Sequence, residues 1–475
     1  MSVTQTSLEE IFHPRSVAFA GITIANPEHW TRNFLRAILA FEFKGPIYLV
    51  NPRGGEIDGL HVYKKLSDVP DTIDYVISTV PASASVQLVR DCALKGVKAV
   101  HFCTSGFSET GMEEGGRLET QLIEAAHSTG VRIIGPNCLG IYCPEAHLSF
   151  RPNFPKDSGP VGLICQSGGN AVTLIKRTEF RGVHFSKAVS YGNACDLDES
   201  DYLEYLADDP DTRIIAMYIE GIKDGKKFRR AAQKAARAKT VVLLKGGVTE
   251  EGARTASGHT GSLAGSCSAW ETLCKQLGII MVSSIEEMAD ILVTLVFMPR
   301  LEGKRVALVG AGGGASVLIS DEFGRKGLKV PPLPEALKKQ MLEYTHIAGN
   351  ILGNPIDYSQ ALTTFEGLAK TVRIISQWED IDIIIGFMSL MFNRLLLQQR
   401  LPIIIKGLLE GGSESEKPLA MVIEPSIVAE EAELISPFIQ NFSSHGVPVY
   451  YSFAGAANAI SKVFSYNEMR LTRQQ

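Results

Sequence analysis

Several features that would point to other classes of protein are missing from this sequence of 475 residues. Its eight cysteines form no CxxC pair and no Cys/His spacing of a zinc site, so we expect reduced cysteines and no metal centre. The net charge is −5, and no run of lysine or arginine is long enough to suggest nucleic acid. We therefore do not expect this chain to be a nucleic-acid-binding protein or a structural zinc protein.

Signals for export or membrane insertion are also missing. The N-terminus, MSVTQTSLEEIF, has no basic segment followed by a long apolar core, so it is not a signal peptide. The longest apolar runs, such as residues 381–392, are too short to span a bilayer. The composition, 45% hydrophobic and 21% charged, is that of a globular protein with large cores. We expect a cytoplasmic protein of about three domains, at roughly 150 residues each.

What the sequence does contain is repeated alternation of apolar strands and amphipathic helices. Residues 16–21, 46–51, 74–81 and 99–106 are predicted strands, each followed by small or turn-forming residues and then by a helix. Alternation of this kind predicts a doubly wound parallel sheet whose strand ends bind a nucleotide-bearing ligand. No GxGxxG follows the first strand, so a simple dinucleotide fingerprint is absent there.

Two breaks divide this alternation. The stretch 144–160 holds four prolines and is predicted to be a linker, and a second boundary falls near 298–304. The sequence thus predicts three doubly wound Rossmann-like or flavodoxin-like α/β domains with mostly parallel sheets. Their predicted limits are 1–145, 146–300 and 301–475.

Two glycine turns follow predicted strands in the second and third domains. The turn QSGG, residues 166–169, places backbone N–H groups and a helix start where an anion such as phosphate is favoured, although glycines also simply permit tight turns. Residues 310–315, GAGGGA, match GxGxxA, but no acidic residue ends the next strand-like segment where a ribose partner is expected. A second phosphate-directed helix start explains this turn equally well.

A single histidine lies in the small-residue stretch 249–265, between a predicted strand at 240–247 and a predicted helix at 263–277 capped by Ser262. Most loop histidines carry no chemistry. Here the small neighbours leave the imidazole of His259 open, and an exposed imidazole near anion-binding N–H groups can attack phosphorus. Glu220, which ends the predicted strand 213–221, could orient such a ring, although a glutamate at a strand end is more often only solvated.

Together these motifs resemble the α subunit of ADP-forming (NDP-forming) acyl-CoA synthetases, relatives of succinyl-CoA synthetase. The resemblance covers nearly the whole chain and is carried by these stretches: SLEEIFHPRSVAFAG, YLVNPR, STVPA, TSGFSETG, IGPNCLGI, QSGG, SYGNACDLDESDYLEYLADDPDT, YIEGIKDG, SGHTGSLAGS, AGGGAS and NPIDYS. It implies a CoA-binding first domain, a ligase domain that carries a phosphohistidine loop, and a third ligase domain.

The resemblance further implies a reaction and the residues that perform it. Acyl-CoA and phosphate would give an acyl phosphate, His259 would take the phosphoryl group with Glu220 orienting it, and ADP would receive it. Phosphate would bind at two helix starts, at Ser167, Gly168, Gly169, Gly312, Gly313 and Gly314. CoA would cross strand ends of the first domain, at Gly21, Asn51, Pro52, Arg53, Val80, Pro81 and Ser105. The thioester or acyl group would lie near Asn137, Cys138, Gly192 and Asn193.

The ATP-grasp module that binds the nucleotide in this family has no counterpart in these residues. The resemblance therefore implies an ATP-grasp β subunit, in an α2β2 hetero-oligomer, that holds ADP or ATP and Mg²⁺.

Two stretches depart from the family pattern. The loop Gly21–Trp30 lacks the usual Gly-Ala-Ser turn and a later glycine, and residues 246–249 replace a Ser-Gly-Arg-Ser stretch. The first departure favours an alternative, a paralogue that binds CoA or acyl-CoA as a regulator. A nicotinamide-dependent oxidoreductase that uses residues 310–315 is a weaker alternative.

Overall fold

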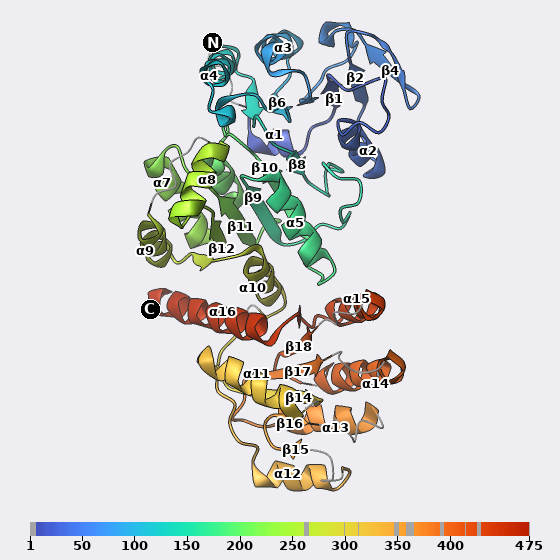
Figure 1. Ribbon diagram of the computed structural model, residues 1–475, viewed down its shortest axis with the longest axis vertical. Helices are drawn as coiled ribbons and strands as arrows, with labels where there is room; N and C mark the ends of the chain where they lie inside the picture. The colour runs from blue at the N-terminus through green and yellow to red at the C-terminus, as the bar shows by residue number, and fades with distance from the viewer. Residues whose placement is uncertain are drawn as a thin grey trace. The chain divides into compact units, whose positions relative to one another are not determined.

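The computed structural model describes residues 6–260, 266–298, 300–311, 313–345, 351–357, 365–389, 394–413, 415–424 and 429–474. The chain divides into two compact units. Unit 1 comprises Met1–Lys176 and His184–Ile285, and unit 2 comprises Arg177–Val183 and Glu286–Gln475. Within the described residues the strands form three sheets, two in unit 1 and one in unit 2 (Figure 1).

The first sheet of unit 1 has the strand order β3-β4-β2-β1-β5-β6-β7, and all its pairs are parallel except β3 with β4. The strands are β1 (Val17–Ala20), β2 (Ile47–Val50), β3 (Gly55–Ile57), β4 (Leu60–Tyr63), β5 (Tyr75–Ser78), β6 (Ala99–Phe102) and β7 (Arg132–Ile134). The helices are α1 (Leu8–Phe12), α2 (Arg32–Ala40), η1 (Leu66–Asp68), α3 (Ala82–Lys95), η2 (Ser108–Thr110) and α4 (Glu113–Thr129). Every residue of β1, β5 and β6 is buried, as expected for central strands covered on both faces.

The second sheet of unit 1 has the order β13-β12-β11-β9-β10-β8, with only β8 antiparallel among its described pairs. Its strands are β8 (Gly140–Tyr142), β9 (Val161–Cys165), β10 (Phe185–Ser190), β11 (Ile214–Ile219), β12 (Thr240–Lys245) and β13 (Ile280–Val282). The helices are α5 (Gly168–Glu179), α6 (Glu199–Asp208), α7 (Gly225–Ala238), α8 (Glu250–Thr260) and α9 (Cys267–Leu277). Aspartates cap two of them: Asp198 accepts N–H bonds at the start of α6, and Asp224 does so for α7.

Unit 2 is built on a sheet with the order β15-β16-β14-β17-β18-β19. Its strands are β14 (Val306–Ala311), β15 (Ile351–Leu352), β16 (Ile356–Asp357), β17 (Ile383–Ser389), β18 (Leu419–Glu424) and β19 (Val449–Tyr450). The helices are α10 (Ile285–Phe297), α11 (Gly313–Arg325), α12 (Glu335–Leu342), α13 (Phe365–Ser376), α14 (Arg394–Ser413), α15 (Ala429–Ser444) and α16 (Phe453–Gln474). In this unit α11 packs beside α16, and α13 beside α14 (Figure 1).

The predicted fold class, α/β with mostly parallel sheets, is confirmed. One element was predicted wrongly: residues 250–260, expected to be part of a loop, form α8. Thr249 caps its start by accepting the Gly252 N–H at 3.1 Å, and two glutamates occupy its first turn, so these helix signals prevail over the small residues.

The helix after the histidine also begins later than predicted. Ser266 caps α9 by accepting the Ala269 N–H, and the helix starts at Cys267 rather than at 263. The predicted cap Ser262 lies outside the described residues. In the part of the chain that is described, no helix combines the length and apolarity needed to cross a membrane.

Candidate functional site

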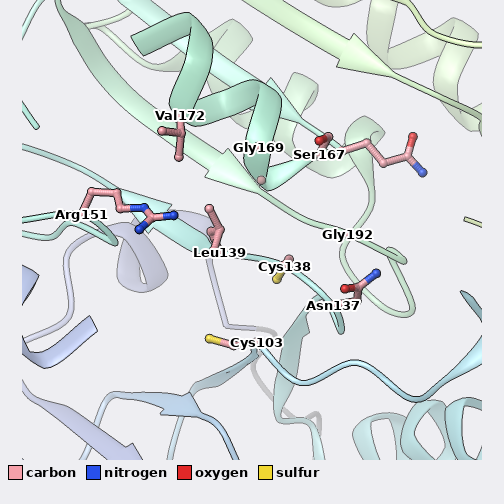
Figure 2. A pocket seen from close by; sticks show the side chains of 11 residues that line it. Cys103, Asn137, Cys138, Leu139, Arg151, Ser167, Gly169, Val172 and Gly192 are labelled. Atoms are coloured by element: carbon pink, nitrogen blue, oxygen red, sulfur yellow. The ribbon is translucent and has the colours of Figure 1, made fainter. Parts of the chain in front are cut away.

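A pocket of about 390 Å³ lies at the carboxyl end of β9, where α5 begins (Figure 2). We call it the α5 pocket, and its walls come from five segments of unit 1. It is lined by Cys103, Asn137, Cys138, Leu139, Arg151, Gln166, Ser167, Gly168, Gly169, Val172 and Gly192. Six of these were predicted from the sequence to bind phosphate or the acyl group: Asn137, Cys138, Ser167, Gly168, Gly169 and Gly192.

The start of α5 gives this pocket a positive electrostatic character. The Ser167 hydroxyl accepts the Asn170 N–H at 3.3 Å, while the other N–H groups of the first turn are left for a ligand. No acidic residue occupies that turn, and among the described residues none of the lining side chains is a carboxylate. Helix dipole and free N–H groups together favour a bound anion here.

Two loops meet at the other wall of the pocket. Gly192 has a φ of 54°, and a Cβ at this position would lie 2.2 Å from the Pro136 carbonyl oxygen, so only glycine fits. The loops are joined by backbone bonds from Asn193 N–H to the Pro136 oxygen and from Cys195 N–H to the Gly135 oxygen, both 3.0 Å. This clamp fixes Asn137 beside the start of α5.

Asn193, predicted to contact substrate, is buried, and its side-chain amide is hydrogen-bonded to two glutamates. Its amide nitrogen donates to Glu109 at 2.6 Å and to Glu119 at 2.9 Å, and it does not line the pocket. Burial raises the pKa of Glu109, but hydrogen bonds from the Asn193 amide and from the N–H groups of Gly106 and Phe107 lower it by more. The net pKa is below its ordinary value, so the carboxylate stays charged. The geometry gives the Asn193 side chain a bracing role between its own loop and the η2–α4 segment, and its contact with substrate stays a prediction.

The thiols of Cys138 and Cys103 line the pocket. Burial raises the pKa of both thiols well above the ordinary value, so both are neutral. The Cys138 carbonyl accepts from the buried ring of His101 at 3.2 Å, and the same ring nitrogen lies 3.3 Å from the Cys103 sulfur. Both thiols therefore line the pocket in their neutral form.

Glu220 is buried directly after β11 and is tied to the pocket through Gln166. The Gln166 side-chain oxygen accepts the N–H of Glu220 at 2.7 Å, and the Tyr218 hydroxyl donates to the Glu220 carboxylate at 3.1 Å. Lys245 donates to the Glu220 carbonyl at 2.7 Å, and burial lowers the pKa of Lys245 to about 8, against the raising effect of the Glu220 charge.

The structure places the backbone of His259 in α8, in the last turn before Thr260. Helix α8 lies beside η2, whose Glu109 holds Asn193 behind the α5 pocket. The side chain of His259 lies outside the described part of the structure, so its orientation by Glu220 stays a prediction. In unit 2, Gly313 and Gly314 begin α11, and Gly312 lies outside the described residues.

A second pocket, of about 630 Å³, lies at the strand ends of the first sheet; we call it the first-sheet pocket. Three of the predicted CoA-binding residues line it: Gly21, Pro52 and Val80. Asn51 is adjacent and braces the loop by donating to the Ile22 carbonyl at 2.9 Å. Arg53, Pro81 and Ser105 are exposed and do not line it.

Several pocket residues were missed from the sequence. Lys64, Lys65 and Lys95 bring three cations to the first-sheet pocket. The first two form a Lys-Lys pair after a short strand that was not predicted from the sequence, and Lys95 ends α3. Arg151 lines the α5 pocket but lies in the stretch predicted to be a linker. Its neighbours Phe150 and Phe154, both buried, were the available signal that this stretch is packed.

Comparison with known proteins identifies the family. Residues 15–144 match the CoA binding domain family, and residues 158–295 match the succinyl-CoA ligase like flavodoxin domain family. The chain is 34% identical over 444 residues to the alpha subunit of acetate–CoA ligase [ADP-forming] II of Pyrococcus furiosus, covering 93% of this chain and 94% of that one. It is 32% identical to the isozyme I alpha subunit of the same organism, covering 99% and 100%. The chain belongs to the family of ADP-forming acetate–CoA ligase alpha subunits.

The fold agrees with this membership. The chain superimposes on the dinucleotide forming acetyl-coenzyme A synthetase 1 of Ca. Korarchaeum cryptofilum, solved with phosphate and ADP, with a TM-score of 0.81 and 31% identity over 98% of each chain. The resemblance predicted from the sequence is confirmed, and the ligase interpretation is supported over the regulatory and oxidoreductase alternatives.

Proposed function

We propose that this chain is the α subunit of an ADP-forming acyl-CoA synthetase, an acid–thiol ligase that acts through acyl phosphate and phosphohistidine intermediates. A phosphate oxygen attacks the thioester carbonyl, the C–S bond breaks, and CoA leaves with a proton as free thiol. A nitrogen of His259 then attacks phosphorus, and the carboxylate leaves. ADP finally takes the phosphoryl group and forms ATP; the reverse direction uses the same steps.

One observation carries this proposal: the α5 pocket joins a helix start suited to phosphate with the loops of Asn137 and Gly192. The N–H groups of Ser167, Gly168 and Gly169 hold phosphate, and Asn137 and Cys138 face the thioester. The first-sheet pocket takes the nucleotide end of CoA, with Lys64 and Lys65 near its phosphates. Gly312–Gly314 supply a second helix start for the phosphoryl group, and Glu220 orients His259.

The remaining assignments complete the proposal. The three domains are 1–145 for CoA binding, 146–300 for the ligase loop and 301–475 for the third ligase domain. An ATP-grasp β subunit supplies the site for ADP or ATP and Mg²⁺, in an α2β2 assembly, and the complex works in the cytoplasm. The designation of both relatives as alpha subunits supports the presence of a partner subunit.

The test uses the chain alone with acetyl phosphate, followed by intact-mass measurement. We expect one added phosphoryl group that is labile in acid and stable in alkali. The adduct should be absent from His259→Asn and present in His127→Asn, a control that changes an exposed histidine on α4. An adduct that persists in His259→Asn, or none in the unmodified chain with several acyl phosphates, would contradict the proposal.

A further inference from the structure

The side chain of Arg151 is a charge in the α5 pocket that the proposed reaction does not use. Its Nε atom is buried and has no hydrogen-bond partner. Across the described residues the structure records no hydrogen bond or ion pair to the Arg151 guanidinium. Arg132, a partly buried arginine of the same unit, is by contrast paired with Asp196 at 2.9 and 3.0 Å. A buried Nε atom without a partner carries a desolvation cost, which an anion that enters the pocket would offset.

The backbone that carries Arg151 is held firmly in place. Phe150 and Phe154 are buried on either side of it, with ring centroids 5.2 Å apart, and Phe154 packs against Tyr142 at 5.2 Å. The Ser149 hydroxyl accepts the Arg151 N–H at 3.1 Å and donates to the Arg151 carbonyl at 2.7 Å. The arginine therefore projects from a fixed base, as a residue that selects a ligand must.

Its place in the pocket separates Arg151 from the reacting atoms. Figure 2 shows Arg151 at one side, near Leu139 and Val172, while Asn137 and Ser167 lie toward the other side. Val172 is about one helical turn beyond Gly168 along α5. An acyl chain that starts at the thioester and runs away from the phosphate would pass Leu139 and Val172 and meet the guanidinium.

We propose that the α5 pocket accepts an acyl group that ends in a second carboxylate, the thioester of CoA with a short dicarboxylic acid, and that Arg151 pairs with this distal carboxylate. The inference rests on the proposed function for the position of the thioester. A planar guanidinium matches a carboxylate with two parallel hydrogen bonds, and among the described lining residues no acidic side chain competes for it. Arg151 is thus a residue that determines specificity rather than one that acts on the reacting bond.

The experiment measures binding of CoA thioesters to the full chain by calorimetry. Two pairs matched in length are compared, succinyl-CoA with butyryl-CoA and glutaryl-CoA with valeryl-CoA. In at least one pair we expect the thioester with the carboxylate to bind about tenfold or more tightly than its neutral partner. Arg151→Gln should remove that preference and leave the affinity for the neutral thioester within about twofold, and Arg151→Lys should retain part of the preference.

The matched control is Arg213→Gln, which removes one positive charge at the exposed amino end of β11, the opposite end of the strand from the pocket. It should leave both pairs unchanged. No preference in the unmodified chain would overturn the inference, and this outcome does not depend on a variant that folds. A preference that survives in Arg151→Gln would also overturn it. Equal weakening of all four thioesters and free CoA would assign Arg151 to CoA instead, and weakening of phosphate alone would assign it to phosphate.

The two proposals fail separately. Loss of the acid-labile adduct on His259 would end the proposed function but would not alter an Arg151-dependent binding preference. Loss of the preference with an intact adduct would overturn only the substrate class.

Discussion

At the residue scale, His101 shows how a neutral imidazole is built into the core beside the α5 pocket. It lies on β6, only 1% exposed, with its ring stacked on Tyr75 and edge-on to Phe34. Its Nε2 must carry the proton, because it donates to the Cys138 carbonyl at 3.2 Å. Burial lowers the pKa of His101 to about 4, against the raising effect of that hydrogen bond.

The lowered pKa predicts a loss of stability in acid. An unfolded histidine takes up a proton near pH 6.5, whereas His101 in the folded chain resists protonation until about pH 4. Its contribution is therefore complete above pH 6.5 and is lost as the pH falls toward 4. Between pH 7.5 and 4.5 the unmodified chain should lose about 2–3 kcal/mol more unfolding free energy than His101→Gln, measured by urea unfolding. The exposed His127→Gln serves as control; identical pH dependence of His101→Gln and the unmodified chain would show that the ring is not held neutral.

Prediction from the sequence was least complete for the individual residues of the α5 pocket. Ser167 was predicted from its glycine turn and Asn137 from the family resemblance, and both line one pocket. Arg151 was missed because proline density at 144–160 indicates a linker, while the packing of Phe150 and Phe154 that fixes it involves Tyr142, a partner in the preceding strand. A contact with a residue outside the local pattern leaves no periodic signal in the sequence.

At the scale of elements, long buried strands could be predicted from the sequence. Very short strands, and a helix whose residues carry both helix and loop signals, could not. Strands such as β9 and β12 are continuous apolar runs, and their parallel order follows from the helices between them. The antiparallel strand β8 has only three residues, too few for a pattern. Helix α8 was predicted as a loop because its small residues are typical of loops, although Thr249 caps its start and two glutamates occupy its first turn.

The clamp between the two pocket loops gives a test at this scale. In Gly192→Ala the new Cβ would lie 2.2 Å from the Pro136 oxygen and 2.4 Å from the Asn137 oxygen, in a left-handed backbone conformation. The Pro136 carbonyl cannot move without breaking its bond to the Asn193 N–H, so we expect a loss of about 3 kcal/mol in unfolding free energy and slower phosphorylation of His259. Gly169→Ala is the control, since its Cβ meets only the Ser167 hydroxyl at 3.9 Å. Equal melting temperatures for the two variants would mean that the clamp is not tightly packed.

At the scale of the whole molecule, unit 2 is not continuous in sequence. Its segment Arg177–Val183 follows α5 residues that belong to unit 1, and it returns to unit 1 at His184. Arg181 anchors this segment inside unit 2: it is 2% exposed, pairs with Asp290 at 2.5 Å and lies over the Tyr451 ring at 5.0 Å. Burial raises the pKa of Asp290 above its ordinary value, and the Arg181 charge offsets only part of that rise.

This anchor predicts how the two units unfold. Arg181→Ala leaves the Asp290 carboxylate buried without its cation, so unit 2 should lose about 3–5 kcal/mol. Scanning calorimetry should show one transition moved to lower temperature and a second, that of unit 1, nearly unchanged. Arg177→Ala is a matched control in the same segment, because its pair with Glu286 is about half exposed on both sides and contributes less than about 1 kcal/mol. If Arg181→Ala instead shifts a single transition, the two units unfold together, and the prediction of separate unfolding is wrong.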